Sequence, residues 1–253
     1  MSIQTASRKN NATEAKFSNR ALANPFAEGA FRWVAKGKYV RCARAGEPCV
    51  CKWFKTGHVD EATFFTDDIM AMHKALEIVK DWNSRRMIDK HIQVNIPKVW
   101  TFDQNSGSVA GKKVLQEPFI LNYQKFNSNS GWANNETPWP RVMQALSHFS
   151  YHVSGRELLL CDLQGGVYDD AVVITDPVIM SKEEIYGVTD LGLKGIRSFF
   201  SQHECNEYCS TKWRRPSKEK CYFNPQAGTV MLKGGTDKRQ YVPTCGPTYK
   251  RYK

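Results

Sequence analysis

The sequence predicts an α+β protein folded into two unequal lobes, the first built mostly of strands and the second of strands and helices together. Short β-prone runs at 39–42 and 49–54 dominate the first part of the chain. In the second part a helical stripe over 142–153 is followed by an apolar run over 157–161. With 253 residues, 41% of them hydrophobic, the chain can bury a substantial core.

The N-terminal part begins with a segment of different composition. Residues 1–23 are polar and rich in Asn, Ser, Ala and Lys, which is typical of a flexible leader. We therefore expect structure to start near Asn24. The two β-prone runs, 39–42 and 49–54, are separated by the turn residues of 46–48.

One helix and one further strand are expected before the second lobe. Between Thr66 and Trp82 apolar residues recur at helical spacing, and Thr66 or Asp67 is the predicted N-cap. A β-prone run over 114–121 then leads into a loop rich in Asn and Ser.

The second lobe combines a helix with two apolar strands. The helix follows Pro140 and ends at Gly155. The runs over 157–161 and 171–174 are predicted to pair as a hairpin that carries acidic residues at one end.

Composition limits the class of protein. No stretch reaches the roughly 20 apolar residues of a membrane span, and the N-terminus lacks the apolar region of a signal peptide. We therefore expect a cytoplasmic protein without a membrane partner. Eight cysteines are then expected to be reduced thiols, and those in apolar contexts to be small core residues: Cys42, Cys49, Cys51 and Cys161.

Positive charge is concentrated at the C-terminal end. The formal net charge is +11, and residues 212–253 hold eleven Lys or Arg against two acidic residues, or +9. This segment is either a solvated basic tail or an electrostatic contact for an acidic partner.

A group of His and Cys residues has the spacing of a metal site. His203, Cys205 and Cys209 form the pattern H-x-C-x3-C, in which the two cysteines four apart can share one face of a helical turn. A closed tetrahedral site needs a fourth ligand, and His148 and His152 on the preceding helix are both candidates. Four protein ligands would leave no open position, so the pattern predicts structural zinc.

A second group of residues is typical of phosphoryl transfer. Asp162 directly follows an apolar strand, Gln164 comes two residues later, and Asp176 follows the next strand. Carboxylate and amide oxygens of this kind suit Mg²⁺. Phosphoryl transfer also needs a cation for the nucleotide phosphates, and Lys52 within a buried-strand run can supply it.

Taken together, these segments resemble the alpha-kinase family of atypical Ser/Thr protein kinases, which includes the myosin heavy chain kinases and the elongation-factor kinase. The matching blocks occur in the family's order over roughly 24–210: 24–32, 49–52, 116–120, 145–148, 157–165, 175–177, 187–195 and 203–209. The resemblance implies a two-lobed, protein-kinase-like alpha-kinase fold with ATP between the lobes and a structural zinc site in the C-terminal lobe.

The resemblance also implies roles for the residues that would bind ATP. Lys52 and Arg32 resemble the family's contacts to the ATP phosphates. Glu117 lies where the segment between the lobes binds adenine, with backbone groups around Ile120 helping. Arg32 could instead pair with Glu28, four residues earlier.

The remaining roles concern catalysis and metals. Asp162 resembles the aspartate that orients or deprotonates the acceptor hydroxyl, and Gln164 and Asp176 resemble the Mg²⁺ ligands. The glycine-containing segment 187–195 resembles a loop near the peptide substrate. The zinc ligands implied are His148, His203, Cys205 and Cys209, which selects His148 over His152.

The resemblance sets the expected domain limits. A leader over 1–23 precedes a catalytic domain over 24–210, with an N-lobe over about 24–121 and a C-lobe over about 122–210, and a basic tail over 211–253 follows. The loop between Gln164 and Asp176 is longer than is usual in the family and adds acidic residues, which we expect near the metal site.

The expected function is a Ser/Thr protein kinase that uses MgATP, acts on a protein substrate and phosphorylates itself. One alternative is an inactive pseudokinase that acts as a binding module. The other is a zinc-stabilised nucleic-acid-binding protein, but this leaves Asp162, Gln164 and Asp176 unexplained, so nucleic acid is not expected as a partner.

Overall fold

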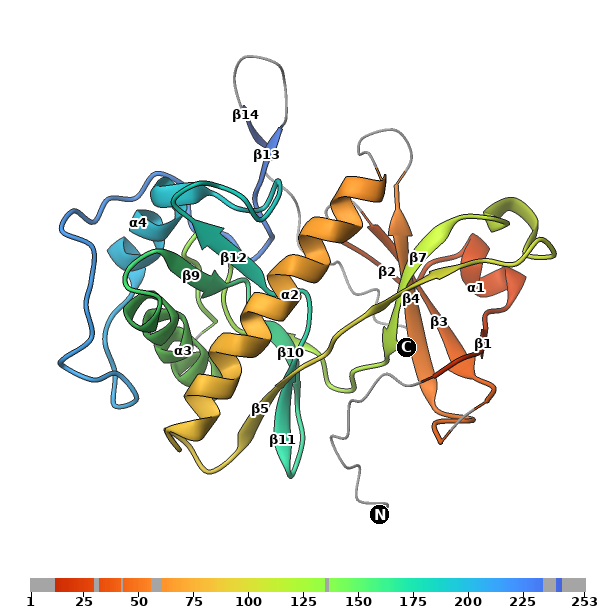
Figure 1. Cartoon of the computed structure of the whole chain (residues 1–253), viewed down its shortest axis with the longest axis horizontal. Coiled ribbons are helices and arrows are strands. Elements are labelled where there is room, and N and C mark those ends of the chain that lie inside the picture. Colours follow the sequence, from red (N-terminus) through yellow and green to blue (C-terminus); the bar gives the residue numbers. More distant parts are fainter. Residues whose placement is uncertain are drawn as a thin grey trace.

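Two lobes lie side by side, and one long helix crosses from one to the other (Figure 1). The computed structural model describes residues 12–29, 32–41, 43–55, 61–134, 137–233 and 240–242, without the side chains of 61–64, 233 and 240–242. The predicted two-lobed α+β architecture, with strands dominating the first lobe, is confirmed.

The N-lobe is an antiparallel sheet. Its strand order is β1-β3-β4-β7-β6, and β2 pairs with β3. Alternate side chains of β3, β4 and β7 bury a small apolar core that includes Ala35, Cys51, Trp53 and Val114. The strands are β1 (Ala15–Lys16), β2 (Ala27–Glu28), β3 (Arg32–Tyr39), β4 (Pro48–Phe54), β6 (Lys98–Thr101) and β7 (Lys113–Pro118). A short 3-10 helix, Gly107–Val109, lies between β6 and β7.

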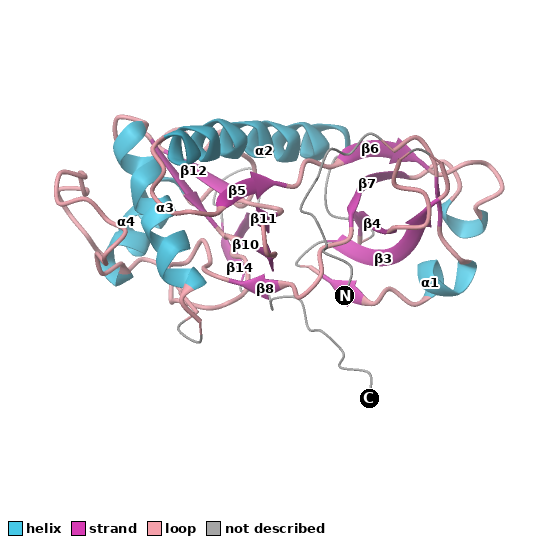
Figure 2. Ribbon diagram, turned by 90° about the horizontal axis from the view of Figure 1, so that it is seen from below, coloured by secondary structure: helices cyan, strands magenta, loops and turns pink. Residues whose placement is uncertain are grey.

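Helix α2 (Glu61–Ser84) connects the lobes along one side (Figure 2). It begins before Thr66, so the predicted N-cap at Thr66 or Asp67 is wrong, although the predicted helix is confirmed. Its apolar face, with Met72, Ala75 and Trp82 buried, packs into the C-lobe core. Helix α2 is therefore anchored in the C-lobe core, while its first turns reach the N-lobe (Figure 1).

The C-lobe contains a four-stranded sheet in the order β5-β11-β10-β8 and a separate pair, β9 with β12. The predicted hairpin of 157–161 with 171–174 is wrong, because β9 pairs with β12 and β11 pairs with β10. The strands are β5 (His91–Val94), β8 (Gln124–Lys125), β9 (Leu158–Cys161), β10 (Gln164–Val167), β11 (Ala171–Ile174) and β12 (Val178–Ser181).

Two helices pack against these strands. Helix α3 (Trp139–Val153) confirms the predicted stripe, and its inner face buries Val142, Met143 and Phe149 against α2 and β9. Helix α4 (Gly192–Gln202) packs against β12. None of the helices in the described part of the chain is long and apolar enough to cross a membrane.

The predicted flexible leader differs from the structure over its described part, 12–23. Here β1 pairs with β3, and helix α1 (Asn19–Ala23) is capped by Ser18. Ala12 is buried against the sheet. The composition was misleading because this polar segment obtains its order from edge pairing with β3, not from a core of its own.

The basic tail also differs from its prediction as a separate segment. Over 211–233 the chain returns across the C-lobe, where Phe223 and Val230 enter the core formed by α4, β9 and β12. Further along the chain, β13 (Met231–Lys233) pairs with β14 (Gln240–Val242) in an antiparallel arrangement. Cys42 lies outside the described residues, whereas Cys49, Cys51 and Cys161 are buried as predicted.

Candidate functional site

A cavity of about 390 Å³ lies between the two lobes. Its N-lobe wall comes from β2, β3, β4 and β7, and its C-lobe wall from the ends of β9, β10 and β11 and from α2. Every residue predicted for nucleotide binding or transfer lines it: Arg32, Lys52, Glu117, Ile120, Asp162, Gln164 and Asp176.

Strand register places Lys52 beside Glu117. Lys52 lies opposite Leu115 in the β4–β7 ladder, and Glu117 is two residues further along β7. Side chains two residues apart point to the same face, so the two are diagonal neighbours. The Lys52 ammonium contacts the Glu117 carboxylate and lies 2.5 Å from Asp176 Oδ2. Burial disfavours its charge, but these two carboxylates outweigh burial and raise the pKa of Lys52.

The Glu117 carboxylate is fully occupied by contacts within the protein. Besides Lys52, it accepts hydrogen bonds from Thr175 Oγ1 over 2.8 Å and from Asn95 Nδ2 over 2.9 Å. Its side chain is 2% exposed, and burial raises its pKa despite the neighbouring ammonium. The Glu117 side chain therefore holds Lys52 in place. The backbone that follows β7 remains to face a ligand, and Ile120 in this stretch also lines the cavity.

Arg32 begins β3 and also points at the acidic group. Its guanidinium contacts Asp68 of α2 and lies 3.8 Å from Asp176 Oδ1. Burial lowers the pKa of Arg32 to about 10, so it stays charged at neutral pH. The alternative pairing with Glu28 is wrong, because Glu28 binds Lys55 over 2.6 Å.

Asp162 directly follows β9 and Asp176 lies two residues after β11, and both have an unusual backbone conformation. Their φ angles are 58° and 46°, in the left-handed region that non-glycine residues seldom occupy. Such conformations cluster at functional sites, where surrounding structure maintains them. Here they turn both carboxylates out of β9 and β11 into the cavity.

The Asp162 carboxylate has contacts on both oxygens. Lys125 Nζ lies 2.8 Å from Oδ1, and Asn129 N donates to Oδ1 over 3.3 Å. Thr229 Oγ1 donates to Oδ2 over 2.8 Å, and Gln164 Nε2 approaches Oδ2 to 3.4 Å.

Gln164 connects Asp162 with Asp176. Its Nε2 donates to Asp176 O over 3.3 Å, and its Oε1 accepts from Lys125 Nζ over 3.0 Å. The next residue must be small, since a Cβ on Gly165 would lie 1.8 Å from Val173 O. Close pairing of β10 with β11 therefore holds Gln164 next to Asp176.

The oxygens of this group fit a hard divalent cation. Gln164 and Asp176 both line the cavity, and their amide and carboxylate oxygens are the ligand types that Mg²⁺ prefers. Burial would raise the pKa of Asp176, but Lys52 and Arg32 lower it, so this side chain is a carboxylate at neutral pH.

The longer loop does not bring acidic residues to this group. The β10–β11 ladder pairs Val167 with Val172 at its turn end and Gly165 with Ile174 at its cavity end. Asp169 and Asp170 are in the turn, at the opposite end of the hairpin from Asp176. The expectation of extra negative charge near the metal site is therefore wrong.

Sequence reasoning missed several residues of the cavity. Lys125 and Asn129 lie in the Asn- and Ser-rich stretch interpreted only as a loop, and Thr229 lies in the segment interpreted as a tail. A Lys that precedes a run of Asn and Ser residues at the start of the C-lobe is a weak signal for the first two. No local signal identifies Thr229, because its contact with Asp162 spans 67 residues.

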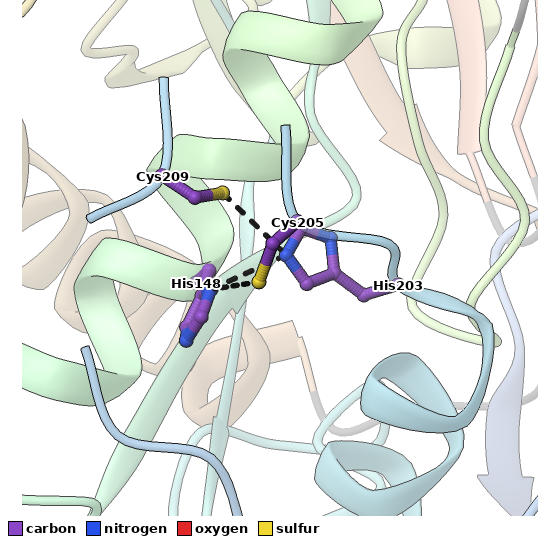
Figure 3. Close-up of side chains that lie close together, drawn as sticks. All are labelled: His148, His203, Cys205 and Cys209. Atoms are coloured by element: carbon purple, nitrogen blue, oxygen red, sulfur yellow. Dashed lines mark hydrogen bonds between the residues drawn. The ribbon is translucent and has the colours of Figure 1, made fainter. Parts of the chain in front are cut away.

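The predicted His and Cys residues converge in the C-lobe (Figure 3). One potential ligand atom from each of His148, His203, Cys205 and Cys209 lies within 4.8 Å of all the others. His203 Nε2 is 3.2 Å from His148 Nδ1, Cys205 Sγ is 3.6 Å from His148 Nδ1, and Cys209 Sγ is 3.7 Å from His203 Nε2.

These separations fit a tetrahedral zinc ion. Zn–N bonds of about 2.0–2.1 Å and Zn–S bonds of about 2.3 Å give tetrahedron edges of about 3.3 Å between nitrogens and about 3.6 Å between nitrogen and sulfur. Burial lowers the pKa of His148 to about 4 and that of His203 to about 3, so both rings are neutral, the form that binds metal.

Residues of the segment predicted as a basic tail contact this cluster. His148 Nε2 lies 3.2 Å from Arg214 O. The lone pair of the other ring nitrogen, Nδ1, is therefore directed at the cluster. Arg215 binds the backbone oxygens of Phe200 and His203 and reaches Cys205 Sγ at 3.5 Å. The other candidate, His152, accepts from Arg214 N instead and is outside the cluster.

The glycine-containing segment 187–195 is organised by a buried carboxylate. Asp190 accepts from Ser181 Oγ over 2.6 Å and from the backbone N–H groups of Ser181, Tyr186 and Gly192 over 2.9–3.2 Å. Thr189, next to it, lines the cavity. The segment therefore forms one edge of the cavity, and the hydrogen bonds to Asp190 hold it in place.

Comparison with known proteins gives a consistent result. The alpha-kinase family profile matches residues 27–209. Alpha-protein kinase 1 of Dictyostelium discoideum is 35% identical over 191 residues, 73% of this chain and 13% of that protein. Myosin heavy chain kinase B of Dictyostelium discoideum is 32% identical over 197 residues, 73% of this chain and 24% of that protein. The chain thus spans no more than about a quarter of the length of these two relatives.

The fold has solved counterparts. The inactive alpha-kinase domain of myosin-II heavy chain kinase A complexed with ATP superposes with a TM-score of 0.64 at 22% identity, over 78% of this chain and 87% of that one. Because the profile covers well over half of the sequence and the fold agrees, the chain belongs to the alpha-kinase family.

Proposed function

We propose that this domain is an atypical protein kinase that transfers the γ-phosphoryl group of MgATP to a Ser or Thr hydroxyl of a protein. One observation carries the proposal: Lys52, Arg32, Asp162 and Asp176, carried by β3, β4, β9 and β11 of the two lobes, meet at one cavity. Family membership and the ATP complex of the myosin-II heavy chain kinase A domain support it.

The nucleotide would lie with its phosphates toward the cations. Lys52 and Arg32 are both charged, both buried, and both directed at Asp176. In a water-poor site such fixed cations stabilise phosphate charge more strongly than in bulk water. The adenine would lie against the backbone of 118–120, because the Glu117 side chain already binds Lys52.

Gln164 and Asp176 are the proposed Mg²⁺ ligands. A bound Mg²⁺ would neutralise the charge of the β- and γ-phosphates. Lys52 and Arg32 would hold the Asp176 carboxylate in place, and Lys125 would hold the Gln164 amide.

Asp162 is the proposed catalytic residue. Lys125 contacts its Oδ1, and its Oδ2 accepts a hydrogen bond from the Thr229 hydroxyl over 2.8 Å, which supports Oδ2 as the oxygen that would bind an acceptor hydroxyl. It would orient the acceptor hydroxyl in line with the γ-phosphorus and take up the proton.

The His and Cys cluster is proposed as a structural zinc site. Its four protein ligands leave no position for water activation. Zinc would join α3, which carries His148, to the segment that follows α4 and carries the other three ligands. That joint would fix the C-lobe wall on which Asp162 lies.

The test is phosphoryl transfer with a matched pair of variants. Purified protein would be incubated with Mg²⁺ and ATP, and ADP formation and phospho-Ser or phospho-Thr measured by mass spectrometry. Asp162→Asn should reduce both at least about 100-fold. Asp169→Asn, an exposed carboxylate in the hairpin turn, should leave both unchanged. No transfer by wild type that binds ATP and contains zinc would favour the pseudokinase.

A further inference from the structure

The hydroxyl of Thr229 lies beside Asp162, where the proposed mechanism requires the acceptor hydroxyl. Its Oγ1 lies 2.8 Å from Asp162 Oδ2, and Thr229 is part of the cavity wall. A general base takes a proton from a group about 2.6–3.2 Å away. Thr229 is half-buried, and the oxygen it contacts is the one not bound by Lys125.

The chain next to Thr229 is held through its backbone, as a bound peptide would be. Val230 N donates to Asn129 Oδ1 and Asn129 Nδ2 donates to Val230 O, both over 2.8 Å. Asn129 is itself tied to the site, because its backbone N donates to Asp162 Oδ1 over 3.3 Å. One residue therefore aligns the segment and the carboxylate with each other.

Contacts on both sides extend this alignment. Upstream, Gln226 N donates to Ser130 Oγ over 3.0 Å. Downstream, Leu232 N donates to Val188 O over 2.8 Å, at the edge formed by 187–195. The segment 226–232 thus runs across the C-lobe from the loop after β8 to the glycine-containing segment.

One buried side chain fixes the register of this segment. Val230 is 0% exposed and packs in the apolar cluster with Leu191, Phe199 and Phe223. A shift by one residue would place Thr229 or Met231 in this apolar site and move the hydroxyl away from Asp162. The register shown is therefore the one that burial favours.

Charge also suits transfer at this position. Residues 226–232 contain no charged side chain, so nothing in the segment repels an incoming phosphate. Once Thr229 carries a phosphate of about −2 charge, it would face the Asp162 carboxylate, and like-charge repulsion would drive the segment out. The product would then leave the acceptor position without a separate trigger.

We propose that Thr229 is an intramolecular phosphorylation site, with 226–232 as the substrate segment; this inference rests on the proposed kinase function. The Thr229 Oγ1 attacks the γ-phosphorus of ATP and a new O–P bond forms. The bond from the γ-phosphorus to the β,γ-bridging oxygen breaks, ADP leaves, and the hydroxyl proton passes to Asp162. No oxidation or reduction occurs.

The experiment uses the full chain after phosphatase treatment. Protein at concentrations spanning about 100-fold is mixed with Mg²⁺ and ATP, and phosphate at Thr229 is quantified over time by mass spectrometry, with dephosphorylated casein as a second acceptor. We expect close to one phosphate per chain at Thr229, with a rate constant independent of protein concentration. Thr229→Ser should retain this modification, Thr229→Ala should lose it, and Thr211→Ala, at an exposed site, should match wild type.

The reaction is also tested in trans by mixing Asp162→Asn protein with wild-type protein that carries heavy isotopes, so that mass spectrometry separates the peptides of the two chains. We expect at least tenfold less phosphate on Thr229 of the inactive chain than wild type places on itself. Asp162-dependent labelling of casein without phosphate at Thr229, or a rate proportional to protein concentration, would overturn the inference and leave the kinase function intact. No ADP, no labelled casein and no phosphate on the chain would overturn the kinase function and this inference with it.

Discussion

The Lys52 ammonium and the Glu117 carboxylate form an ion pair that is almost closed to solvent, with side-chain exposures of 9% and 2%. Thr175 and Asn95 fix the carboxylate from the other side. Breaking a buried ion pair from one side leaves an uncompensated charge. The pair therefore determines both where Lys52 points and how stable this part of the N-lobe is.

Replacing Glu117 with Gln tests this relationship. The amide can still accept from Thr175 or Asn95, but it carries no charge to hold Lys52. We expect kcat/KM for ATP to fall at least about 10-fold, or about 1.4 kcal/mol, and the protein to be destabilised by about 1–3 kcal/mol. Steady-state kinetics and thermal unfolding check both. Glu157→Gln, at an exposed pair with Lys182, is the control; equal effects of the two substitutions would contradict the assigned role.

The residues that could be predicted from sequence have signals that are local. Lys52 lies in an apolar run, Asp162 directly follows one, and the motif around Asp176 is short. His203, with the two cysteines that follow it, has ligand spacing within seven residues. In each case the strand or turn that carries the residue also directs it, so neighbouring sequence contains enough information.

The parts that could not be predicted depend on contacts between distant segments. The β9 strand pairs with β12 and not with the next apolar run, because Asp162 turns the chain with a positive φ before β10 begins. The resemblance places Glu117 where the segment between the lobes binds adenine, but it gives no sign of the hydrogen bonds that Asn95 and Thr175 donate to the Glu117 carboxylate. The basic composition likewise predicted a tail over 211–253, although two buried side chains, Phe223 and Val230, attach its described part to the C-lobe.

Lys125 is predicted to matter for the transfer step more than for ATP binding. Its ammonium lies 2.8 Å from Asp162 Oδ1 and 3.0 Å from Gln164 Oε1, so it would position both the proposed catalytic carboxylate and the proposed Mg²⁺ ligand. Lys125→Met should lower kcat at least about 10-fold with a smaller change in KM for ATP. Lys112→Met, an exposed lysine of the N-lobe, is the control. A raised KM with unchanged kcat would instead indicate a contact to the nucleotide.

Loss of one zinc ligand should destabilise the whole C-lobe. Cys209→Ala removes one corner of the four-residue cluster and leaves α3 no longer joined to the segment after α4. We expect a loss of at least about 2 kcal/mol and a Tm lower by roughly 4–8 °C. Cys221→Ala, at an exposed thiol, should change Tm little. Equal melting temperatures for wild type and Cys209→Ala would refute a structural zinc.

Alkylation should divide the described cysteines into three groups. Burial raises the pKa of Cys49 to about 12 and raises those of Cys51 and Cys161, so these thiols should stay unmodified by iodoacetamide at pH 8. Cys221 is exposed and should react at once. Cys205 and Cys209 should react only after a chelator removes zinc, as peptide mapping would show. Their immediate reaction in untreated protein containing one zinc per chain would place the metal elsewhere.

Asp190 is predicted to link the stability of the C-lobe to the binding of a protein substrate. Its two carboxylate oxygens accept from Ser181 and from the backbone N–H groups that shape 186–192, and all of these donors are buried. In Asp190→Asn one oxygen becomes an NH₂ group that faces donors, which should cost about 1–3 kcal/mol of stability.

The kinetic effect of Asp190→Asn should be selective for the acceptor. Thr189 O accepts from Asn129 Nδ2 over 3.0 Å, so a looser 186–192 segment also loosens Asn129, which aligns the backbone beside Thr229. The ATP phosphates would contact Lys52 and Arg32, on the opposite wall of the cavity. We therefore expect KM for a protein acceptor to rise several-fold while KM for ATP changes less than twofold, with Asp89→Asn, an exposed carboxylate, as the control. Equal rises in both KM values would mean that the substitution disturbs the whole cavity and that 187–195 has no particular role at the acceptor side.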